Sequence, residues 1–259
     1  MKNIISRKLK DSGIENYIFE AKIIEEHAEK YKLDAYILAE RRIKREPLQY
    51  IIGEWEFYGD IYKLNKDCLI PRPETEFLTE YIINNAEKNA LILDLCSGSG
   101  CVSISALKRR EDLQAVLVEI SPGAVNISRE NAVINKVSDR IKFYCLDIIK
   151  NCGEIARICK PGLIVSNPPY LSSREMRQIK SENTELSHEP AAAFDGGADG
   201  LDFYKFIINN YKNICSEIVF ECGISQHKKI IELFGQHDFK CGIIKDYNKI
   251  ERVIIGKKT

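Results

Sequence analysis

From residue 91 onward, short apolar runs that favour β-strands alternate with stretches of helical periodicity. Helical patterns fill most of the intervals between these runs, for example at residues 102–109 and 124–135. Repeated strand–helix units predict an α/β fold with a mostly parallel, doubly wound sheet and helices on both faces. The last two runs have only a short link between them, which predicts an antiparallel hairpin at one edge. The seven strand candidates are residues 91–95, 115–119, 141–146, 163–166, 217–221, 239–244 and 252–255.

The first 46 residues show helical periodicity without a strand pattern, which predicts a small module of three or four short helices. Asp34 is a candidate N-cap for a helix that continues through Ile43, and we expect Pro47 to end this helix. The end of the helix carries a basic cluster, which is either a solvated face or a surface for a partner: Arg41, Arg42, Lys44 and Arg45.

The next segment, residues 49–70, is rich in β-forming side chains. They cluster at residues 50–52 and 55–58, and a further run follows at 61–64 after a Gly-Asp pair. This pattern predicts a hairpin that links two domains. The expected organisation is therefore a helical domain at residues 1–48, a hairpin linker at 49–70 and the sheet domain at 71–259.

Charge and hydropathy exclude several classes of protein. Lys+Arg and Asp+Glu both number 38, so the formal net charge is zero. A protein held on nucleic acid by phosphate contacts usually shows a basic excess, so we expect no direct nucleic-acid binding. No apolar run approaches the roughly 20 residues of a membrane helix. The first residues also lack the apolar core of a secretory signal, so we expect a cytoplasmic protein without a membrane partner. We also expect it to act as a monomer.

The nine cysteines do not form a metal-binding pattern. Their number is odd, no pair forms C-x-x-C, and the four histidines are scattered, so we predict no metal site. Several cysteines lie in or beside apolar runs, among them Cys145 and Cys222. We expect reduced, buried thiols in a reducing compartment.

A glycine-containing loop follows the first strand of the sheet domain. Gly98 and Gly100 have no Cβ, so the backbone can turn tightly and a ligand can approach it. In doubly wound sheets, ligands bind outside the carboxyl ends of the strands. This loop is therefore either part of a ligand pocket or a structural turn, and its candidate binding residues are Cys96, Ser97, Gly98, Ser99 and Gly100.

Acidic residues end the next two strands. Glu119 lies 21 residues after Gly98, where a carboxylate can accept both hydroxyl hydrogens of a ribose; the alternative is a cap for the following helix. Asp147 is a candidate acceptor for an adenine amino group, with Ile148 against the ring, or else an N-cap. The third glycine of a dinucleotide fingerprint would fall at Ser103, which favours S-adenosylmethionine over a ligand with a pyrophosphate.

The most informative segment is Asn-Pro-Pro-Tyr at residues 167–170, where the fourth strand ends. At average composition, this tetrapeptide arises by chance in such a chain roughly once in a thousand. Pro168 and Pro169 fix φ and stiffen the loop. The loop carbonyls and the side-chain oxygen of Asn167 are acceptors, and Tyr170 offers a flat face. A rigid turn without a chemical role is the alternative.

These groups suit a planar NH₂ group conjugated to a π system. Two acceptors that hold both N–H bonds would favour the charge that develops on the nitrogen during attack on a methyl donor, and stacking on Tyr170 would fix the plane. The predicted chemistry is in-line displacement aided by positioning and electrostatics, without a dedicated general base. By analogy with an oxyanion-hole donor, loss of the Asn167 side chain would cost about 3 kcal/mol, roughly 10²–10³ in rate.

From about Pro47 to the C-terminus, the sequence resembles the peptide chain release factor glutamine methyltransferases, the HemK/PrmC family. Two blocks separate this family from nucleic-acid amino-methyltransferases, which share the Asn-Pro-Pro-Tyr loop: Glu-Pro-Ala-Ala-Ala-Phe at 189–194 and Gly-Gly-Ala-Asp-Gly-Leu at 196–201. The remaining segments that carry the resemblance are Pro-Leu-Gln-Tyr-Ile-Ile-Gly at 47–53, Leu-Ile-Pro-Arg-Pro-Glu-Thr-Glu at 69–76 and the loop around Gly98.

The resemblance implies a seven-stranded, Rossmann-like class I methyltransferase domain behind a small helical domain that docks a class 1 release factor. It implies methylation of the side-chain amide nitrogen of the glutamine in the factor's Gly-Gly-Gln loop, with S-adenosylmethionine as donor and S-adenosylhomocysteine as product. Residues 96–100 would line the methionine end of the donor, Glu119 would bind its ribose, and Asp147 and Ile148 its adenine.

The resemblance also assigns the reaction centre. Asn167 would touch both donor and substrate, and it would hold the substrate glutamine together with Pro168, Pro169 and Tyr170. Cys96 stands where the family often has glycine, and Glu119 where it often has aspartate. Two other hypotheses stay open: an adenine or cytosine amino-methyltransferase acting on nucleic acid, and a non-catalytic protein that binds the factor.

Overall fold

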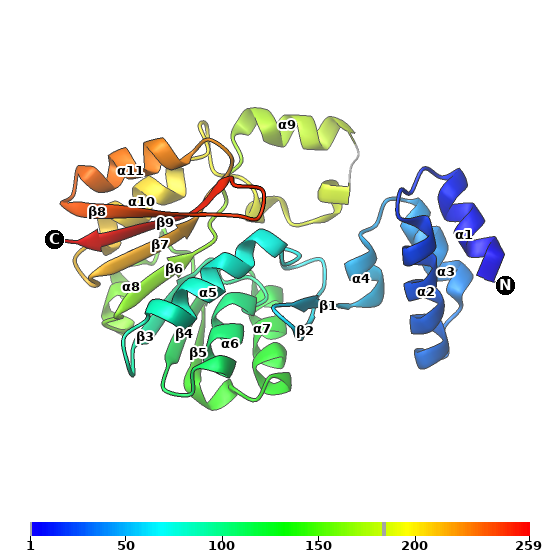
Figure 1. The fold of residues 1–259 in the computed structure, drawn as a ribbon, viewed down its shortest axis with the longest axis horizontal. Helices are drawn as coiled ribbons and strands as arrows, with labels where there is room; N and C mark the ends of the chain where they lie inside the picture. Colours follow the sequence, from blue (N-terminus) through cyan, green and yellow to red (C-terminus); the bar gives the residue numbers. More distant parts are fainter. Residues whose placement is uncertain (1, 183–184) are drawn as a thin grey trace.

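The computed structural model describes residues 2–182 and 185–259, and a seven-stranded sheet is its main element (Figure 1). The strands are β3 (Leu91–Leu95), β4 (Gln114–Glu119), β5 (Ile141–Cys145), β6 (Leu163–Ser166), β7 (Glu217–Glu221), β8 (Phe239–Lys245) and β9 (Glu251–Lys258). Their order is β5-β4-β3-β6-β7-β9-β8. β9 is antiparallel to both β7 and β8, and the other neighbours are parallel. The predicted doubly wound sheet with an antiparallel hairpin at one edge is confirmed.

Two hydrophobic cores sandwich this sheet, because its central strands are buried on both faces. One core contains apolar side chains of α5, α6 and α7, and the other those of α8, α10 and α11. A further helix, α9, precedes the 3₁₀ turns Glu185–His188 and Ala191–Ala193. The helices are α5 (Glu76–Asn85), α6 (Cys101–Arg109), α7 (Pro122–Ile134), α8 (Cys152–Ile158), α9 (Ser173–Glu182), α10 (Asp202–Tyr211) and α11 (His227–Gly235).

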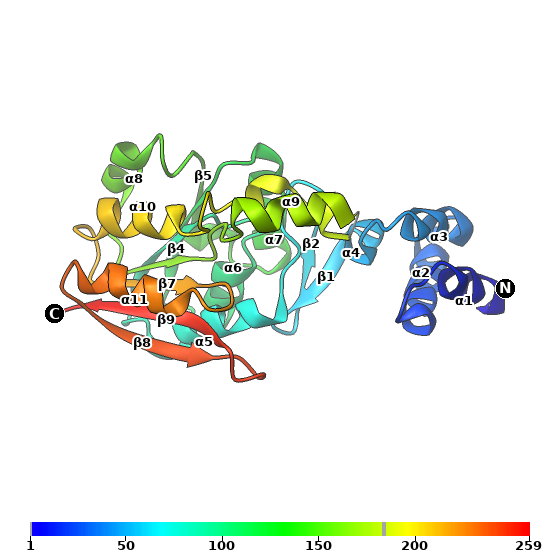
Figure 2. The same cartoon turned by 90° about the horizontal axis from the view of Figure 1, so that it is seen from above.

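The N-terminal helices form a separate module that stands to one side of the sheet (Figures 1 and 2). They bury their own apolar cluster, which includes Leu9, Ile24 and Leu38. A short antiparallel hairpin of β1 (Glu54–Phe57) and β2 (Asp60–Lys63) follows, as predicted. The helices of the module are α1 (Lys2–Asp11), α2 (Tyr17–Tyr31), α3 (Ala35–Ile43) and α4 (Leu48–Ile52).

Residues 50–52 are helical, so the expectation that they form part of a strand is wrong. They belong to α4, in which Leu48 and Ile51, three positions apart, both pack into the core of the helical module. Gly53 ends the helix at φ +76°, a conformation that favours glycine. Burial of one helical face therefore outweighs the β-preference of the side chains.

Asp34 caps α3 as predicted, since its side chain accepts a hydrogen bond of 2.8 Å from the backbone N–H of Tyr36. Pro47 does not end this helix, however. The helix stops at Ile43, because Arg45 takes up a left-handed conformation at φ +67°, and Pro47 instead precedes α4.

The basic cluster at the end of α3 is mostly engaged within the molecule. Arg42 is buried and pairs with Glu20 of α2 and with Glu185 of the sheet domain. Arg41 pairs with Glu46, while Arg45 donates to the carbonyl oxygens of Ser12 and Gly13. Arg42 therefore joins the helical module to the sheet domain.

All nine cysteines are free thiols, and most are at least half-buried. Cys222 is buried, as expected. The expectation for Cys145 is wrong, because it is exposed at the end of the edge strand β5. None of the helices in the described ranges is both long and apolar enough to span a bilayer.

Candidate active site

The candidate site lies where the parallel strands end, around a cavity of about 200 Å³. The loops after β3, β4, β5 and β6 all contribute to its wall, as the topology of a doubly wound sheet requires. Seven of the predicted site residues line it: Cys96, Gly98, Glu119, Asp147, Ile148, Asn167 and Pro169. The remaining predicted residues, which are Ser97, Ser99, Gly100, Pro168 and Tyr170, lie beside or behind the wall.

The loop after β3 is divided between residues that face the cavity and residues that support it. Gly98, at φ +54°, has open space where a Cβ would stand, whereas a Cβ on Gly100 would lie 2.9 Å from Ile104 Cδ1. Ser99 is buried, and its carbonyl accepts from Asn131. Cys96 takes φ +61°, where glycine is favoured, so this departure from the family pattern carries backbone strain.

Glu119 turns both carboxylate oxygens toward the chain's own N–H groups. Oε2 accepts from Gly98 at 2.9 Å, and Oε1 accepts from Ser121 at 3.0 Å. Burial raises the pKa of this carboxyl, and these N–H groups partly offset the effect. Glu119 thus ties the glycine loop to the end of β4, and the remaining lone pairs face a cavity that suits a hydroxylated ligand.

Asp147 and Ile148 form the next part of the wall. Oδ1 of Asp147 accepts from the backbone N–H groups of Ile149 and Lys150. Burial acts to raise the pKa of Asp147, but these N–H groups hold it below its usual value. Asp147 is not the N-cap that the sequence offered as an alternative, because α8 has Asn151 at that position. It instead closes a local turn, which keeps the carboxylate ionised beside the apolar surface of Ile148, only 4% exposed.

Asn167 contributes a side-chain amide at the end of β6. Its Nδ2 donates to the hydroxyl oxygen of Thr75, at 3.3 Å. Because the nitrogen is engaged there, the oxygen is the acceptor end of the amide at the cavity wall.

Glycines elsewhere in the chain hold the Asn-Pro-Pro-Tyr loop. A Cβ on Gly196 would lie 2.8 Å from the carbonyl oxygen of Pro169, and one on Gly200 would lie 2.3 Å from that of Tyr170. Gln226 also donates to the Tyr170 carbonyl, at 2.8 Å. The glycine-rich block at 196–201 is therefore explained by close backbone packing against the loop.

Tyr170 is half-buried behind the loop, and burial together with the nearby Glu221 carboxyl raises the pKa of its phenol. Glu221 ends β7 and is only 1% exposed. Burial raises the pKa of this carboxyl to about 7, against the lowering effect of a side-chain hydrogen bond from Thr75. Among the described residues, its Oε2 has no hydrogen-bond partner.

Part of the cavity wall was not predicted from the sequence. These residues come from the segment before α5, from the segment around the last 3₁₀ turn, and from α10. The block at 189–194 marked one of these segments, but no role followed from its residue types. The wall residues from these three segments include Asp67, Cys68, Leu69, Pro190 and Phe203.

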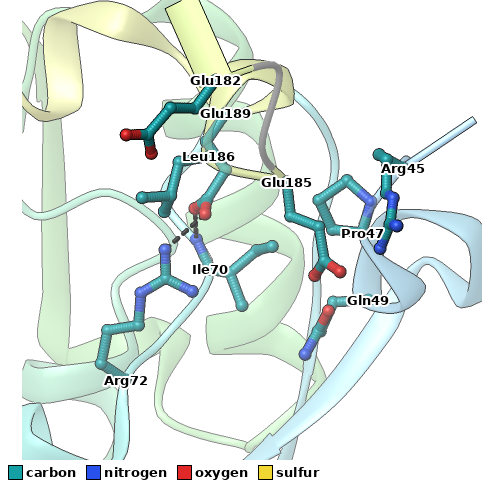
Figure 3. Close-up of a pocket in the computed structure, with 9 residues that line it drawn as sticks. All are labelled: Arg45, Pro47, Gln49, Ile70, Arg72, Glu182, Glu185, Leu186 and Glu189. Carbon is teal, nitrogen blue, oxygen red and sulfur yellow. Dashed lines mark hydrogen bonds and ion pairs between the residues drawn. The ribbon is translucent and has the colours of Figure 1, made fainter. Parts of the chain in front are cut away.

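Glu189 ties two of these wall segments together. Its buried carboxylate accepts a hydrogen bond of 3.0 Å from the backbone N–H of Ile70 and pairs with Arg72 (Figure 3). Ile70, Arg72 and Glu189 also line a second cavity, of about 500 Å³, together with Arg45 and Gln49 of the N-terminal segment. The chain neighbours Leu69 and Pro190 line the first cavity, so the Glu189 contact joins two segments that contribute to both cavities.

Comparison with known proteins agrees with this geometry. The family model for the methyltransferase small domain matches residues 73–186. The solved structure of SMU.776, a putative methyltransferase complexed with SAH, superimposes with a TM-score of 0.56 at 16% identity, over 79% of this chain and 56% of that chain. This structural likeness supports the Rossmann-like methyltransferase fold.

Sequence relatives are more specific. The release factor glutamine methyltransferase of Geobacter sulfurreducens is 37% identical over 224 residues, or 85% of this chain and 76% of that protein. That of Thermodesulfovibrio yellowstonii is 35% identical over 264 residues, or 99% of this chain and 91% of that protein. The resemblance inferred from the sequence is confirmed, and the chain belongs to the release factor glutamine methyltransferase family.

Proposed function

We propose that this protein methylates the side-chain amide nitrogen of the glutamine in the Gly-Gly-Gln motif of a class 1 peptide chain release factor, and so modulates translation termination. The observation that carries the proposal is Asn167, whose amide nitrogen is held by Thr75 so that its oxygen is available as an acceptor at the cavity wall. The activity for which the relatives are named supports the same reaction.

The residues around the cavity fit S-adenosylmethionine. Gly98 leaves open space beside the backbone, Glu119 offers carboxylate lone pairs for the ribose, and Asp147 with Ile148 pairs an ionised acceptor with an apolar surface for the adenine. Asn167 completes the wall at the methionine end. When bound, the donor supplies an electrophilic methyl carbon; the product is S-adenosylhomocysteine.

The chain's own groups act on the substrate amide by holding and orienting it. The Asn167 oxygen and the backbone carbonyl of Pro168 would accept its two N–H bonds, because the Tyr170 carbonyl already accepts from Gln226. The ring of Tyr170 would lie against the plane of the carboxamide. Fixed acceptors favour the positive charge that develops on the nitrogen, so rigidity of the loop contributes directly to rate.

The release factor would reach this site past the second cavity. Glu182, Glu185 and Glu189 line that cavity together with residues of the N-terminal segment, so both parts of the molecule present side chains to an incoming chain. We infer that the helical module, α1 to α4, docks the factor there. We propose the division into residues 1–48, 49–70 and 71–259, except that α4, which packs into the helical module, extends the first domain to Ile52.

The test is to incubate the protein with methyl-labelled S-adenosylmethionine and a release factor, and in parallel with a factor whose Gly-Gly-Gln glutamine is replaced. Label is expected only in the first. Equal labelling of both would reject the proposal, and label in added RNA or DNA would instead support a nucleic-acid amino-methyltransferase. Absence of S-adenosylmethionine binding by calorimetry would support a non-catalytic factor-binding protein.

A further inference from the structure

Three side chains from different parts of the chain form a connected series behind the site. Asn167 directly follows β6, Thr75 lies in the 3₁₀ turn Pro73–Thr75 before α5, and Glu221 ends β7. Asn167 Nδ2 donates to Thr75 Oγ1 at 3.3 Å, and the Thr75 side chain lies close enough to the Glu221 carboxyl to lower its pKa. Thr75 and Glu221 are 3% and 1% exposed, so water does not compete strongly for these contacts.

We propose that Thr75 and Glu221 are positioning residues that hold the Asn167 amide with its nitrogen turned inward and its oxygen toward the substrate. A threonine hydroxyl has one hydrogen to donate. If that hydrogen is given to the Glu221 carboxylate, Thr75 can only accept from Asn167, and the bonded atom of the amide must be the nitrogen. The inference rests on the proposed function, in which the Asn167 oxygen accepts from the substrate amide.

The opposite orientation would block the reaction. If Asn167 were flipped, its NH₂ group would face the NH₂ group of the substrate, and two donors cannot pair. An asparagine side chain alone has little preference between the two orientations, because its terminal torsion is broad. The direction must therefore be imposed by neighbours, and an ionised carboxylate is a group that only accepts.

Glu221 is poorly explained as a stabilising residue. A carboxyl that is 1% exposed and has an unpartnered oxygen costs stability in its ionised form. Arg72 and Arg252 lower its pKa, while Glu74 raises it. Replacing such a group by an apolar side chain of similar size is often neutral or stabilising. A loss of rate in such a variant therefore could not be attributed to unfolding.

The variants Thr75→Val and Glu221→Met remove the hydroxyl and the carboxylate with little change in volume. We expect each to lower kcat for release factor methylation about tenfold at pH 8, the effect of one lost neutral hydrogen bond, with KM for the factor changed less than twofold. Thr75→Ser and Glu221→Gln, which keep a hydroxyl and an acceptor oxygen, should stay within about threefold of the parent rate.

Thr79→Val is the matched control. Thr79 is also buried and lies four positions further along the chain, in α5, but its hydroxyl contacts the carbonyl of Val102 at 3.4 Å instead of Asn167. Its kcat should be unchanged. Thermal unfolding of every variant checks that the fold is intact. Equal kcat in Thr75→Val and Thr79→Val would overturn the inference.

A double-mutant cycle with Asn167→Ala separates positioning from a general structural role. If Thr75 acts only through Asn167, then adding Thr75→Val to Asn167→Ala leaves kcat unchanged. A further tenfold loss in the double variant would show that Thr75 acts by another route and would overturn the inference. If the unmodified protein fails to label the release factor at all, the proposed function itself fails, which is a distinguishable result.

Discussion

Glu189→Ala is the substitution for which the structure gives the clearest energetic expectation. The Glu189 side chain is 2% exposed and holds two partners, the backbone N–H of Ile70 and the guanidinium of Arg72 (Figure 3). Alanine removes both contacts, so the segment around Ile70 is no longer held to the segment around Glu189. The Arg72 side chain, at 30% exposed, can regain water, but the N–H of buried Ile70 cannot do so easily.

The expected loss follows from three contributions. Leaving a buried N–H without a partner costs about 1–3 kcal/mol. The ion pair with half-exposed Arg72 adds at most about 1 kcal/mol, because solvent screens it. Removing the one buried methylene that alanine lacks, Cγ, adds about 0.8 kcal/mol. The total is about 3–4 kcal/mol, which corresponds to a fall in Tm of about 10 °C for a chain of this size.

Urea and thermal unfolding measure this loss, and calorimetry with S-adenosylhomocysteine measures its effect on the site. Affinity should fall as well, because Leu69 and Pro190, the neighbours of the two tied positions, line the donor cavity. Glu182→Ala is the control: Glu182 is exposed and lines the same second cavity, so it should change stability by less than about 0.5 kcal/mol. Glu189→Gln keeps an acceptor for the Ile70 N–H, so its loss of stability should lie between those of Glu182→Ala and Glu189→Ala. A Glu189→Ala protein within about 1 kcal/mol of the parent would refute the reasoning.

Three further expectations follow. Burial raises the pKa of Asp94 to about 7, and a hydrogen bond from Ser103 partly offsets this effect. The folded protein therefore binds this proton more tightly than the unfolded chain, so the free energy of unfolding should fall as pH rises from 5 toward 7. In urea titrations at pH 5 and pH 8, Asp94→Asn should remove about 3 kcal/mol of that fall. Gly100→Ala should lower stability by about 2–3 kcal/mol, because a left-handed conformation is combined with a clash, whereas Gly98→Ala should mainly weaken S-adenosylhomocysteine binding. A thiol reagent should label one cysteine rapidly, and Cys145→Ser should abolish that phase.

The sheet could be predicted from the sequence because parallel strands covered on both faces leave short, nearly continuous apolar runs. All seven runs became strands. Residues 50–52 show where this reasoning fails. Their side chains favour strands, but Leu48 and Ile51 gain burial against α1 to α3 only as a helix, and that surface is invisible in a local window.

The site was predictable to the same extent. Residues at strand ends, such as Glu119, Asp147 and Asn167, could be placed together because the topology brings all carboxyl ends to one edge. Leu69 and Phe203 could not, because they come from segments whose position depends on tertiary packing. Thr75 could not be identified from the sequence for a related reason: its proposed role depends on a contact with Asn167, 92 positions away in the chain.

Several strained or unsatisfied groups of this molecule lie at the edge where its parallel strands end. Cys96 has a positive φ, and Ser97 Oγ and Glu221 Oε2 are two of the four buried side-chain atoms without a partner in the described ranges. Asp94 and Glu221, each with a pKa of about 7, end strands on either side of β6. Dry, rigid surroundings raise the free energy of these groups, but they also keep the Asn167 acceptor fixed and strengthen its interaction with charge. In the proposed mechanism, the buried surroundings that lower stability here are also the ones that hold Asn167 for methyl transfer.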